Sequence, residues 1–270
     1  FLAPGELHHV LQIVAIICIA VGAGASGAIN MWFDRDIDQI MSRTRSRPIP
    51  SGRVNPEAAL TFGVVLSGGS IMIMGLAVNW LASFLLASTI AFYIFIYTVW
   101  LKRSTPQNIV IGGAAGALPP VIGWAAISGS VALDPIILFA LIFIWTPPHF
   151  WALALYRSDD YEAAGVPMLP VTHGSQETRR QILIYSSILF LVSLLPYLVG
   201  MAALTYFIVA VVMGALFLIL AWRVFRLGLV KSCKQLFGFS IVYLFVLFLA
   251  LLTDKAIGLP YPLELAKVLY

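Results

Sequence analysis

The chain has 270 residues, of which 61% are hydrophobic and only 10% are charged, and its mean hydropathy is +0.97. Soluble domains carry about 25% charged residues, so this composition excludes a soluble globular protein and indicates an integral membrane protein. The two cysteines, Cys18 and Cys233, lie in or beside apolar segments without a C-x-x-C spacing. We interpret them as packing residues, not as a disulfide or a metal pair.

Eight apolar windows are long enough to cross a bilayer, which takes about 20 residues in a helix. They fall near residues 10–33, 57–78, 80–100, 108–127, 135–155, 181–200, 204–222 and 236–254. Alternating strand patterns are absent from the sequence, so the windows are not read as strands. The sequence therefore predicts an all-α, polytopic transmembrane bundle.

Basic residues divide the connections between these windows into two sets. The connections at 34–56, 101–107, 156–180 and 223–235 hold 14 of the 16 Lys and Arg residues, and the connections between them hold none. By the positive-inside rule, the basic set faces the cytoplasm or the mitochondrial matrix. The net charge of +4 is thus mainly a topology signal, and we do not interpret it as a nucleic-acid-binding patch.

The two ends of the chain are predicted on the opposite side. The N-terminus opens with FLAPGELHH, without an initiator Met or a signal-peptide pattern. The remaining basic residues, Lys255 and Lys267, belong to a C-terminal tail whose last residues, 259–270, read as an interfacial segment.

One polar stripe stands at the end of the first window. Asn30, Asp34 and Asp38 recur every four residues, so on a helix they share a face at a spacing of about 6 Å. Amide and carboxylate oxygens suit Mg²⁺, which usually also takes substrate phosphates as ligands. Arginines follow at once, including Arg43 and Arg47. Because polar groups near the bilayer are costly, we favour a site for a metal-bound diphosphate over a set of solvated charges.

Further polar residues share the predicted cytoplasmic face. Asp159 and Asp160 supply candidate ligands for a second cation, and Arg157 a phosphate contact. For Lys102 and Arg103, a topology role and ligand binding both remain open. Asn108, at the start of the fourth window, either caps the helix or contacts a ligand. Four other acids, which are Asp36, Glu57, Glu162 and Glu177, read as solvated loop charges.

Two proline pairs are expected to interrupt helices. In the run GGAAGALPP at 112–120, small residues precede a double proline, which fits either close packing with a kink or the wall of an apolar cavity. Pro147-Pro148 is expected to break a helix beside His149, a histidine near membrane depth and therefore a functional candidate. His173 is either a solvated loop residue or a second such candidate.

Several strings between about 22 and 174 resemble the intramembrane prenyltransferases of the UbiA superfamily. They are NMWFDRDID with MSRTRSRPIP, LKRSTPQNIVIGGAAGALPPVIGWAA, WTPPHFWALAL and DYEAAGVPMLPV, and they are most similar to the branch that farnesylates haem. Residues 181–270 match only as generic helices. The resemblance implies a single domain over 1–270, with helices around a central cavity and a cytoplasmic cap bearing two aspartate-rich motifs.

The chain departs from the family's pattern at two points. The family has nine helices, so we expect its first helix to be missing before residue 1. The later motif is usually D-x-x-x-D, but Tyr156 takes the first position and only Asp160 matches the second. Asp159 is the candidate substitute, and a symmetric second metal site is not expected.

The resemblance also implies the activity. Farnesyl diphosphate would donate its prenyl group to a vinyl group of haem B, with water addition, giving haem O and diphosphate. The cofactor would be Mg²⁺, at Asn30, Asp34, Asp38 and Asp160, with Asp159 a further ligand. The diphosphate would be held by Arg43, Arg47, Lys102, Arg103, Arg157 and Asn108. His149, and after it His173, are the candidates for orienting haem.

The implied setting is the bilayer of a bacterial inner membrane, or of the mitochondrial inner membrane, with haem A synthase as a downstream partner. Two alternatives stay open. One is a related prenyltransferase that acts on an aromatic or quinone precursor, against which PPHFWALAL and DYEAAGVPMLPV argue. The other is a cation-coupled transporter, disfavoured because the acids lie at one face beside arginines, not at the midplane.

Overall fold

The computed structural model describes residues 2–258, and this part of the chain is helical without strands. Eight segments are long and apolar enough to cross a membrane, which confirms the predicted multi-pass bundle. Five of them are single helices: α1 (His9–Phe33), α8 (Leu133–Leu155), α11 (Gly174–Leu198), α12 (Leu204–Leu227) and α13 (Val230–Ile257). The predicted interfacial segment at 259–270 and Lys267 lie outside the described residues.

The other three spans are composite. They are α3 (Pro56–Ile73) with the π-helix η1 (Met74–Val78); α4 (Trp80–Ala91) with the π-helix η2 (Phe92–Leu101) and α5 (Lys102–Ser104); and α6 (Asn108–Ala117) with α7 (Pro119–Ser128). Three short helices lie in the connections: α2 (Arg35–Ile40), α9 (Ser158–Ala163) and α10 (Leu169–Thr172).

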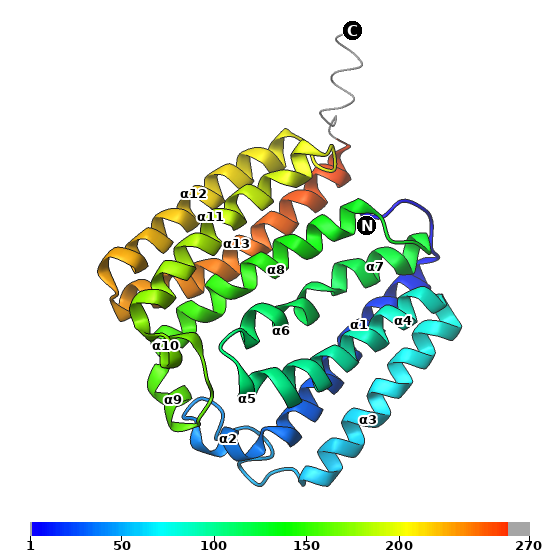
Figure 1. Ribbon diagram of the computed structural model, residues 1–270. Helices are drawn as coiled ribbons and strands as arrows, with labels where there is room; N and C mark the ends of the chain where they lie inside the picture. The colour runs from blue at the N-terminus through cyan, green and yellow to red at the C-terminus, as the bar shows by residue number, and fades with distance from the viewer. Residues whose placement is uncertain (1, 259–270) are drawn as a thin grey trace. The chain divides into compact units, whose positions relative to one another are not determined.

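The chain forms two compact units, which we describe separately. Among the described residues, the N-terminal unit comprises residues 3–131 and 157–172, and the C-terminal unit comprises residue 2, residues 132–156 and residues 173–258. The prediction of one domain over 1–270 stays a prediction. In the C-terminal unit, α8 packs against α11 and α13, and α12 packs against the same two helices (Figure 1).

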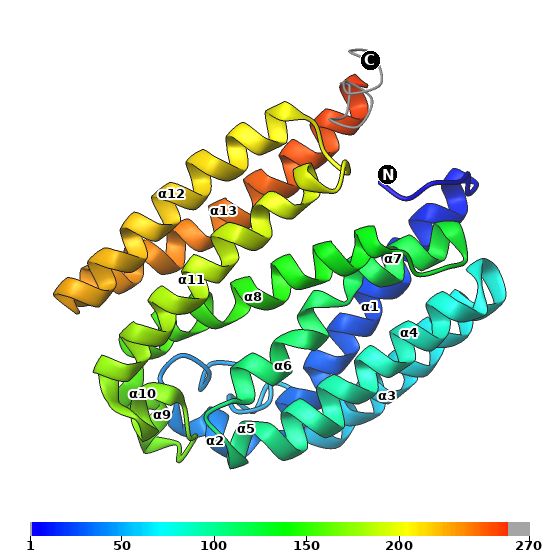
Figure 2. The same cartoon turned by 45° about the horizontal axis from the view of Figure 1, so that its top comes forward.

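In the N-terminal unit, α1 packs along α3 and also contacts α4, η2 and α7. The short helices α2, α5 and α9 gather at the end of the unit where α1 terminates (Figures 1 and 2). This end matches the predicted cap, because it carries both aspartate-rich segments.

The two proline pairs behave differently. Pro119 and Pro120 stand in the first turn of α7, where a missing N–H is tolerated, and the span breaks at Leu118 as predicted. The expected break at Pro147-Pro148 is wrong, because α8 continues through both residues. Both prolines are buried by packing, and such tertiary contacts hold a helix on its path despite lost backbone bonds.

Several helices continue past the predicted apolar windows into segments that contain charged residues. The predicted connection at 223–235 shrinks to Gly228-Leu229, because the flanking Arg and Lys residues belong to α12 and α13. Gly228 ends α12 with a φ of 61° and donates its N–H to the carbonyl of Val224, a conformation that favours glycine. Likewise α11 begins at Gly174, seven residues before the predicted window. Long basic side chains tolerate these positions because their charged ends reach past the apolar region.

The start of α12 is capped by a side chain from another helix. Its N-cap residue, Ala203, has no side chain able to accept a hydrogen bond. Instead, Oδ2 of Asp254 on α13 accepts from the backbone N–H groups of Ala203 at 2.8 Å and Tyr206 at 3.2 Å. Asp254 is buried, with 1% of its surface exposed. The carboxyl group therefore links α13 to the beginning of α12.

Candidate active site

The predicted polar stripe is present on one helical face. α1 ends at Phe33 and α2 begins at Arg35, but the backbone ladder continues through the junction. The N–H of Asp34 donates to the carbonyl of Asn30 at 2.9 Å, and that of Asp38 to the carbonyl of Asp34 at 2.8 Å. Asn30, Asp34 and Asp38 are all buried, at 7%, 0% and 1% exposure. The three side chains therefore keep their common face beyond the end of α1.

Two basic side chains and an amide converge on Asp34. Lys102 of α5 donates to Oδ2 in an ion pair, and Arg103 Nη2 lies 3.2 Å from Oδ1. Asn30 donates its amide Nδ2 to Asp34 Oδ2 at 2.7 Å. For Lys102 and Arg103, a topology role and ligand binding were both open. The structure places both side chains at the stripe. A buried carboxylate is costly unless it is paired, and these contacts provide the pairing.

Asp36 holds Arg103 from the solvent side. Both guanidinium nitrogens of Arg103 lie 2.7 Å from the two carboxylate oxygens of Asp36. This two-bond contact lowers the pKa of Asp36 to about 2, so the carboxylate stays ionised at neutral pH. Asp36 was expected to be a solvated charge, and its side chain is indeed 61% exposed, but it has a fixed partner. Arg103 thus bridges Asp34 and Asp36.

Asp38 is paired with one of the arginines that follow the stripe. Arg47 Nη1 donates to Asp38 Oδ2 at 2.8 Å. The hydroxyl of Thr44 donates to the Asp38 carbonyl at 3.1 Å, which folds the connection back on α2. Arg43 points elsewhere, since it interacts with the phenol of the buried Tyr161 on α9 and with Asp160.

Asp160 joins the second acidic segment to the first. Its Oδ2 accepts from the hydroxyl of Ser42 at 2.6 Å, and its Oδ1 accepts from the Ser42 N–H at 3.3 Å. Arg157 lies 3.7 Å from Asp160 and 3.4 Å from the Ser42 hydroxyl. Asp159 is exposed and contacts the hydroxyl of Ser158 at 3.2 Å. Asp160, and not Asp159, therefore reaches the connection that carries the arginines.

Ser42 was not predicted by the sequence reading, and its role can be tested by pH. Its hydrogen bond, with the charges of Arg157 and Arg43, holds the pKa of Asp160 below the ordinary 3.8. Because the pKa is lowered, the stabilisation that this contact gives the folded state is fully present above pH 3.8. It is lost as the pH falls through the lower pKa of the folded state. We expect Ser42→Ala to move the Asp160 pKa back toward 3.8.

A carboxyl ¹³C NMR titration of aspartate-labelled protein would measure this shift. Ser51→Ala is the matched control, because the Ser51 hydroxyl lies in the same connection but donates to the carbonyl of Arg47. An Asp160 pKa that is the same in Ser42→Ala and in the parent would show that the serine does not set it.

Asn108 does not cap its helix. Its Nδ2 donates to the Thr105 carbonyl at 2.7 Å, while its buried Oδ1 has no hydrogen-bond partner among the described residues. The cap interpretation is therefore wrong. A buried acceptor without a partner is costly, so this oxygen suits a donor or a cation supplied by a ligand.

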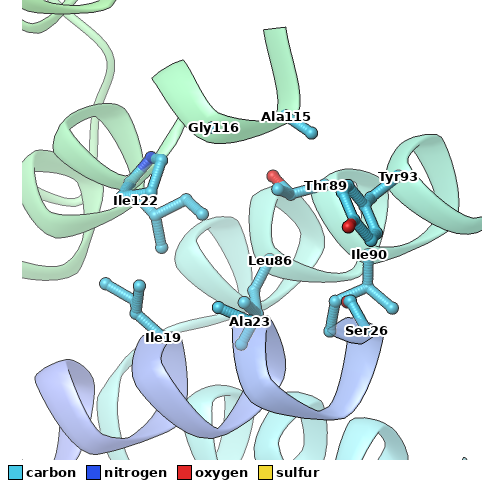
Figure 3. A pocket seen from close by; sticks show the side chains of 11 residues that line it. Ile19, Ala23, Ser26, Leu86, Thr89, Ile90, Tyr93, Ala115, Gly116 and Ile122 are labelled. Atoms are coloured by element: carbon cyan, nitrogen blue, oxygen red, sulfur yellow. The ribbon is translucent and has the colours of Figure 1, made fainter. Parts of the chain in front are cut away.

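An apolar cavity of about 240 Å³ lies within the N-terminal unit, lined by residues of α1, α4, η2, α6 and α7 (Figure 3). Its wall includes Ala115, Gly116 and Pro119 of the GGAAGALPP run, so the cavity-wall interpretation of that run is confirmed. Close packing is also present, because a Cβ added at Gly112 would overlap the Tyr97 ring. Both interpretations therefore hold for different residues of the run.

The cavity and the stripe share helix α1. Ile19, Ala23 and Ser26 line the cavity, and Asn30 follows Ser26 by one helical turn. Tyr93 also lines the cavity, beside Thr89 and Ile90 (Figure 3). A molecule with an anionic head and an apolar chain would find a polar region and an apolar region along one helix.

The two histidine candidates belong to the C-terminal unit. His149 is buried, and its Nδ1 lies 2.6 Å from the Ser240 hydroxyl. Its ring stacks between Trp145 and Phe237, with centroid distances of 4.3 and 4.6 Å. His173 is exposed at the start of α11. His149 is therefore buried among aromatic side chains, whereas His173 is accessible.

The donor set fits Mg²⁺ bound together with a substrate. Within the described residues, no three His, Cys, Asp or Glu side chains come close enough to hold a metal alone. Mg²⁺ is usually bound through one or two carboxylates plus substrate phosphates, and the stripe offers two carboxylates and an amide. The basic side chains around Asp34 and Asp38 are suited to the phosphates.

Comparison with known proteins gives the family. A model described as the UbiA prenyltransferase family matches residues 1–252. Protoheme IX farnesyltransferase of Parvibaculum lavamentivorans is 58% identical over 261 residues, which cover 95% of this chain and 82% of that protein. The enzyme of the same name from Azorhizobium caulinodans is 58% identical over 259 residues, covering 94% and 84%.

Solved structures show the same fold at low identity. A digeranylgeranylglyceryl phosphate synthase aligns with a TM-score of 0.78 at 20% identity, covering 94% of this chain and 88% of that one. A UbiA homologue from Archaeoglobus fulgidus, bound to GPP and Mg²⁺, aligns with a TM-score of 0.59 at 17% identity, covering 89% and 87%. With the family model matching nearly the whole chain, the chain belongs to the UbiA prenyltransferase family.

Proposed function

We propose that this protein transfers the farnesyl group of farnesyl diphosphate to a vinyl group of haem B, with addition of water, giving haem O and diphosphate. The choice of acceptor and donor rests on the relatives named protoheme IX farnesyltransferase, which are 58% identical over most of the chain. The structural observation that carries the proposal is the apolar cavity placed one helical turn from a buried acidic stripe with basic partners.

The diphosphate head would bind at the cap. Asn30, Asp34 and Asp38 would hold Mg²⁺ from one side, with Asp160 the candidate from α9 and Asp159 a weaker one. The cations already paired with these acids would turn toward the phosphate oxygens; they are Arg43, Arg47, Lys102, Arg103 and Arg157. Asn108 would contribute its amide oxygen Oδ1, which has no hydrogen-bond partner among the described residues, as a contact for the cation that accompanies the diphosphate. The A. fulgidus homologue bound to GPP and Mg²⁺ supports the choice of metal.

The farnesyl chain would lie in the cavity. Among the cavity-lining residues of α1, Ile19 lies farthest from Asn30 in the sequence. The 11 residues of helix that separate these two positions rise about 16 Å. This length suits a chain of three prenyl units. Apolar walls would exclude water from the allylic cation that forms when the C1–O bond breaks, and the aromatic ring of Tyr93, which lines the cavity, would stabilise positive charge.

The reaction balances without a nucleophilic side chain. The C1–O bond of farnesyl diphosphate breaks, and both bonding electrons leave with diphosphate. The terminal vinyl carbon of haem B then bonds to C1, and water adds to the neighbouring carbon and releases a proton. Bound Mg²⁺ supplies stabilisation of the charge that builds on the departing diphosphate. Lys102 and Arg103 add fixed positive charge at the same place.

Haem would be oriented by the C-terminal unit. His149 is our first candidate because it is a buried histidine within a membrane-spanning helix, and His173 is the second. Histidine is a common axial ligand of haem iron, and loss of the haem absorbance shift on addition of haem B to His149→Ala would identify it.

The acceptor is tested by direct competition of substrates. Purified protein is incubated with farnesyl diphosphate, Mg²⁺ and either haem B or 4-hydroxybenzoate, and the products are separated by chromatography. We expect a farnesylated haem and no prenylated benzoate. A product formed only from the benzoate would overturn the haem assignment while leaving prenyl transfer intact.

We also propose that the cap faces the cytoplasm of a bacterial inner membrane, or the matrix if the protein is mitochondrial. The asymmetric distribution of Lys and Arg supports this orientation. A haem A synthase would act next on the product. A membrane-impermeant thiol reagent should label Ser51→Cys only in vesicles whose cytoplasmic face is outward, and labelling of the opposite vesicles would reverse the orientation.

A further inference from the structure

Two pairs of polar side chains face each other where α1 approaches η2. Asn30 lies on α1 and Asp34 four residues later at the junction of α1 and α2, and Thr98 and Lys102 lie four residues apart on η2 and α5. Asn30 contacts Thr98, with Nδ2 3.1 Å from Oγ1, and Asp34 contacts Lys102. Lys102 was a candidate from the sequence, but Thr98 was not.

The contacts of Asn30 determine how its amide is turned. Nδ2 donates to Asp34 Oδ2 at 2.7 Å and to Thr98 Oγ1 at 3.1 Å. An amide nitrogen has two hydrogens, so both are used. The oxygen Oδ1 is left as the acceptor of the side chain, and it is the only atom of this amide that can bind a cation.

Asp34 cannot maintain this orientation during the reaction by itself. As a proposed metal ligand, it would offer its carboxylate oxygens to the cation and would weaken its hold on the Asn30 nitrogen. Thr98 has no such competing role in the proposed chemistry. Its side chain is fully buried, at 0% exposure, so packing restricts its hydroxyl to the position beside Asn30.

Thr98 also differs from the other helical threonines of the N-terminal unit. The hydroxyls of Thr61 and Thr89 donate to the carbonyl four residues earlier, at 3.0 and 2.7 Å, which is the usual local bond for threonine in a helix. The hydroxyl of Thr98 instead accepts from a residue 68 positions earlier in the chain. It lies in the π-helix η2, and π-helical turns are frequent at functional sites.

We propose that Thr98 is a positioning residue for the metal site: its hydroxyl holds the Asn30 amide so that Oδ1 faces the cation. The inference rests on the proposed role of Asn30 as a ligand of Mg²⁺. Partners that orient a metal ligand typically change metal affinity by about 10–100-fold when they are removed. The expected loss in Thr98→Val, which keeps the shape of the side chain and removes the hydroxyl, is of this size.

The test measures metal binding, not turnover. Mn²⁺ replaces Mg²⁺, and its binding is followed by electron paramagnetic resonance in the presence of farnesyl thiodiphosphate, which resists ionisation. We expect about tenfold weaker Mn²⁺ binding for Thr98→Val and near-parental binding for Thr98→Ser, which restores the hydroxyl. Thermal unfolding in detergent identifies any variant that has lost its fold, and if Thr98→Val is one of them, Thr98→Ala, which also lacks the hydroxyl, replaces it.

A double-mutant cycle separates positioning from packing. In Asn30→Asp both side-chain atoms are oxygens, so there is no amide orientation left to fix. Adding Thr98→Val to this background should change Mn²⁺ affinity by less than about twofold, since two residues acting through one contact are not additive. Equal losses with and without Asn30→Asp would overturn the proposal, as would a Thr98→Ser variant as weak as Thr98→Val.

Failure of the proposed function gives a different result. If Asp34→Asn binds Mn²⁺ as well as the parent does, the stripe is not the metal site and the premise is wrong. If Asp34→Asn loses Mn²⁺ while Thr98→Val keeps parental affinity, the stripe binds metal and only the role of Thr98 is refuted.

Discussion

Replacing Asp34 by Asn is expected to abolish prenyl transfer while the protein stays folded. The substitution keeps the size of the side chain but removes the charge that pairs with Lys102 and Arg103. It also removes a carboxylate from a site that offers only two on one face. Because stabilisation of the departing diphosphate depends on these groups, we expect kcat/KM to fall on the order of 100-fold or more.

The measurement is the amount of farnesylated haem formed by purified protein, with size-exclusion chromatography in detergent to verify folding. Asp36→Asn is the matched control, two residues away. Its ion pair with Arg103 is solvent-exposed, and such pairs are worth about 0–1 kcal/mol, so a loss of no more than about fivefold is expected. Near-normal activity of Asp34→Asn would show that the stripe does not bind the metal.

Filling the cavity at Gly116 is expected to have the second largest effect. A Cβ at Gly116 meets no heavy atom within 4 Å, so Gly116→Leu extends into the cavity without displacing the helix. Its four added carbons would occupy space that the farnesyl chain needs. A mismatch of a single methylene in an apolar pocket is worth about 10–200-fold in kcat/KM, and we expect a loss at least this large with farnesyl diphosphate.

Geranyl diphosphate, one prenyl unit shorter, should lose less activity in this variant, so the preference between the two donors shifts. Gly123→Leu on α7 is the control, because a Cβ there also meets nothing within 4 Å and Gly123 does not line the cavity. Unchanged kinetics of Gly116→Leu with farnesyl diphosphate would place the prenyl chain elsewhere.

The features that sequence analysis predicted are those with a local cause. Hydropathy over about 20 residues marks a membrane helix, and all eight spans are present. The stripe was predictable because positions four apart share a helical face whatever else surrounds them. The helix ends were less accurate, since apolar windows stop at the first charged residues and the helices do not.

The missed features depend on packing between distant parts of the chain. Asp160 pairs with Ser42 across 118 positions, and Asn30 with Thr98 across 68. No spacing or periodicity in the sequence marks such partners. The continuity of α8 through Pro147-Pro148 has the same origin, because neighbouring helices and not local preference maintain it. The π-helical form of η2 is also absent from the hydropathy pattern.

The cap of α12 has a consequence for the order in which the C-terminal unit is assembled during synthesis. The backbone amides of Ala203 and Tyr206 obtain their acceptor from Asp254, which follows them by 51 and 48 residues. When α12 leaves the ribosome, therefore, its first turn has no side-chain partner, and one arrives only with the last turns of α13. The hydrogen bonds from the first turn of α12 to Asp254 can therefore form only when α12 and α13 pair as a hairpin.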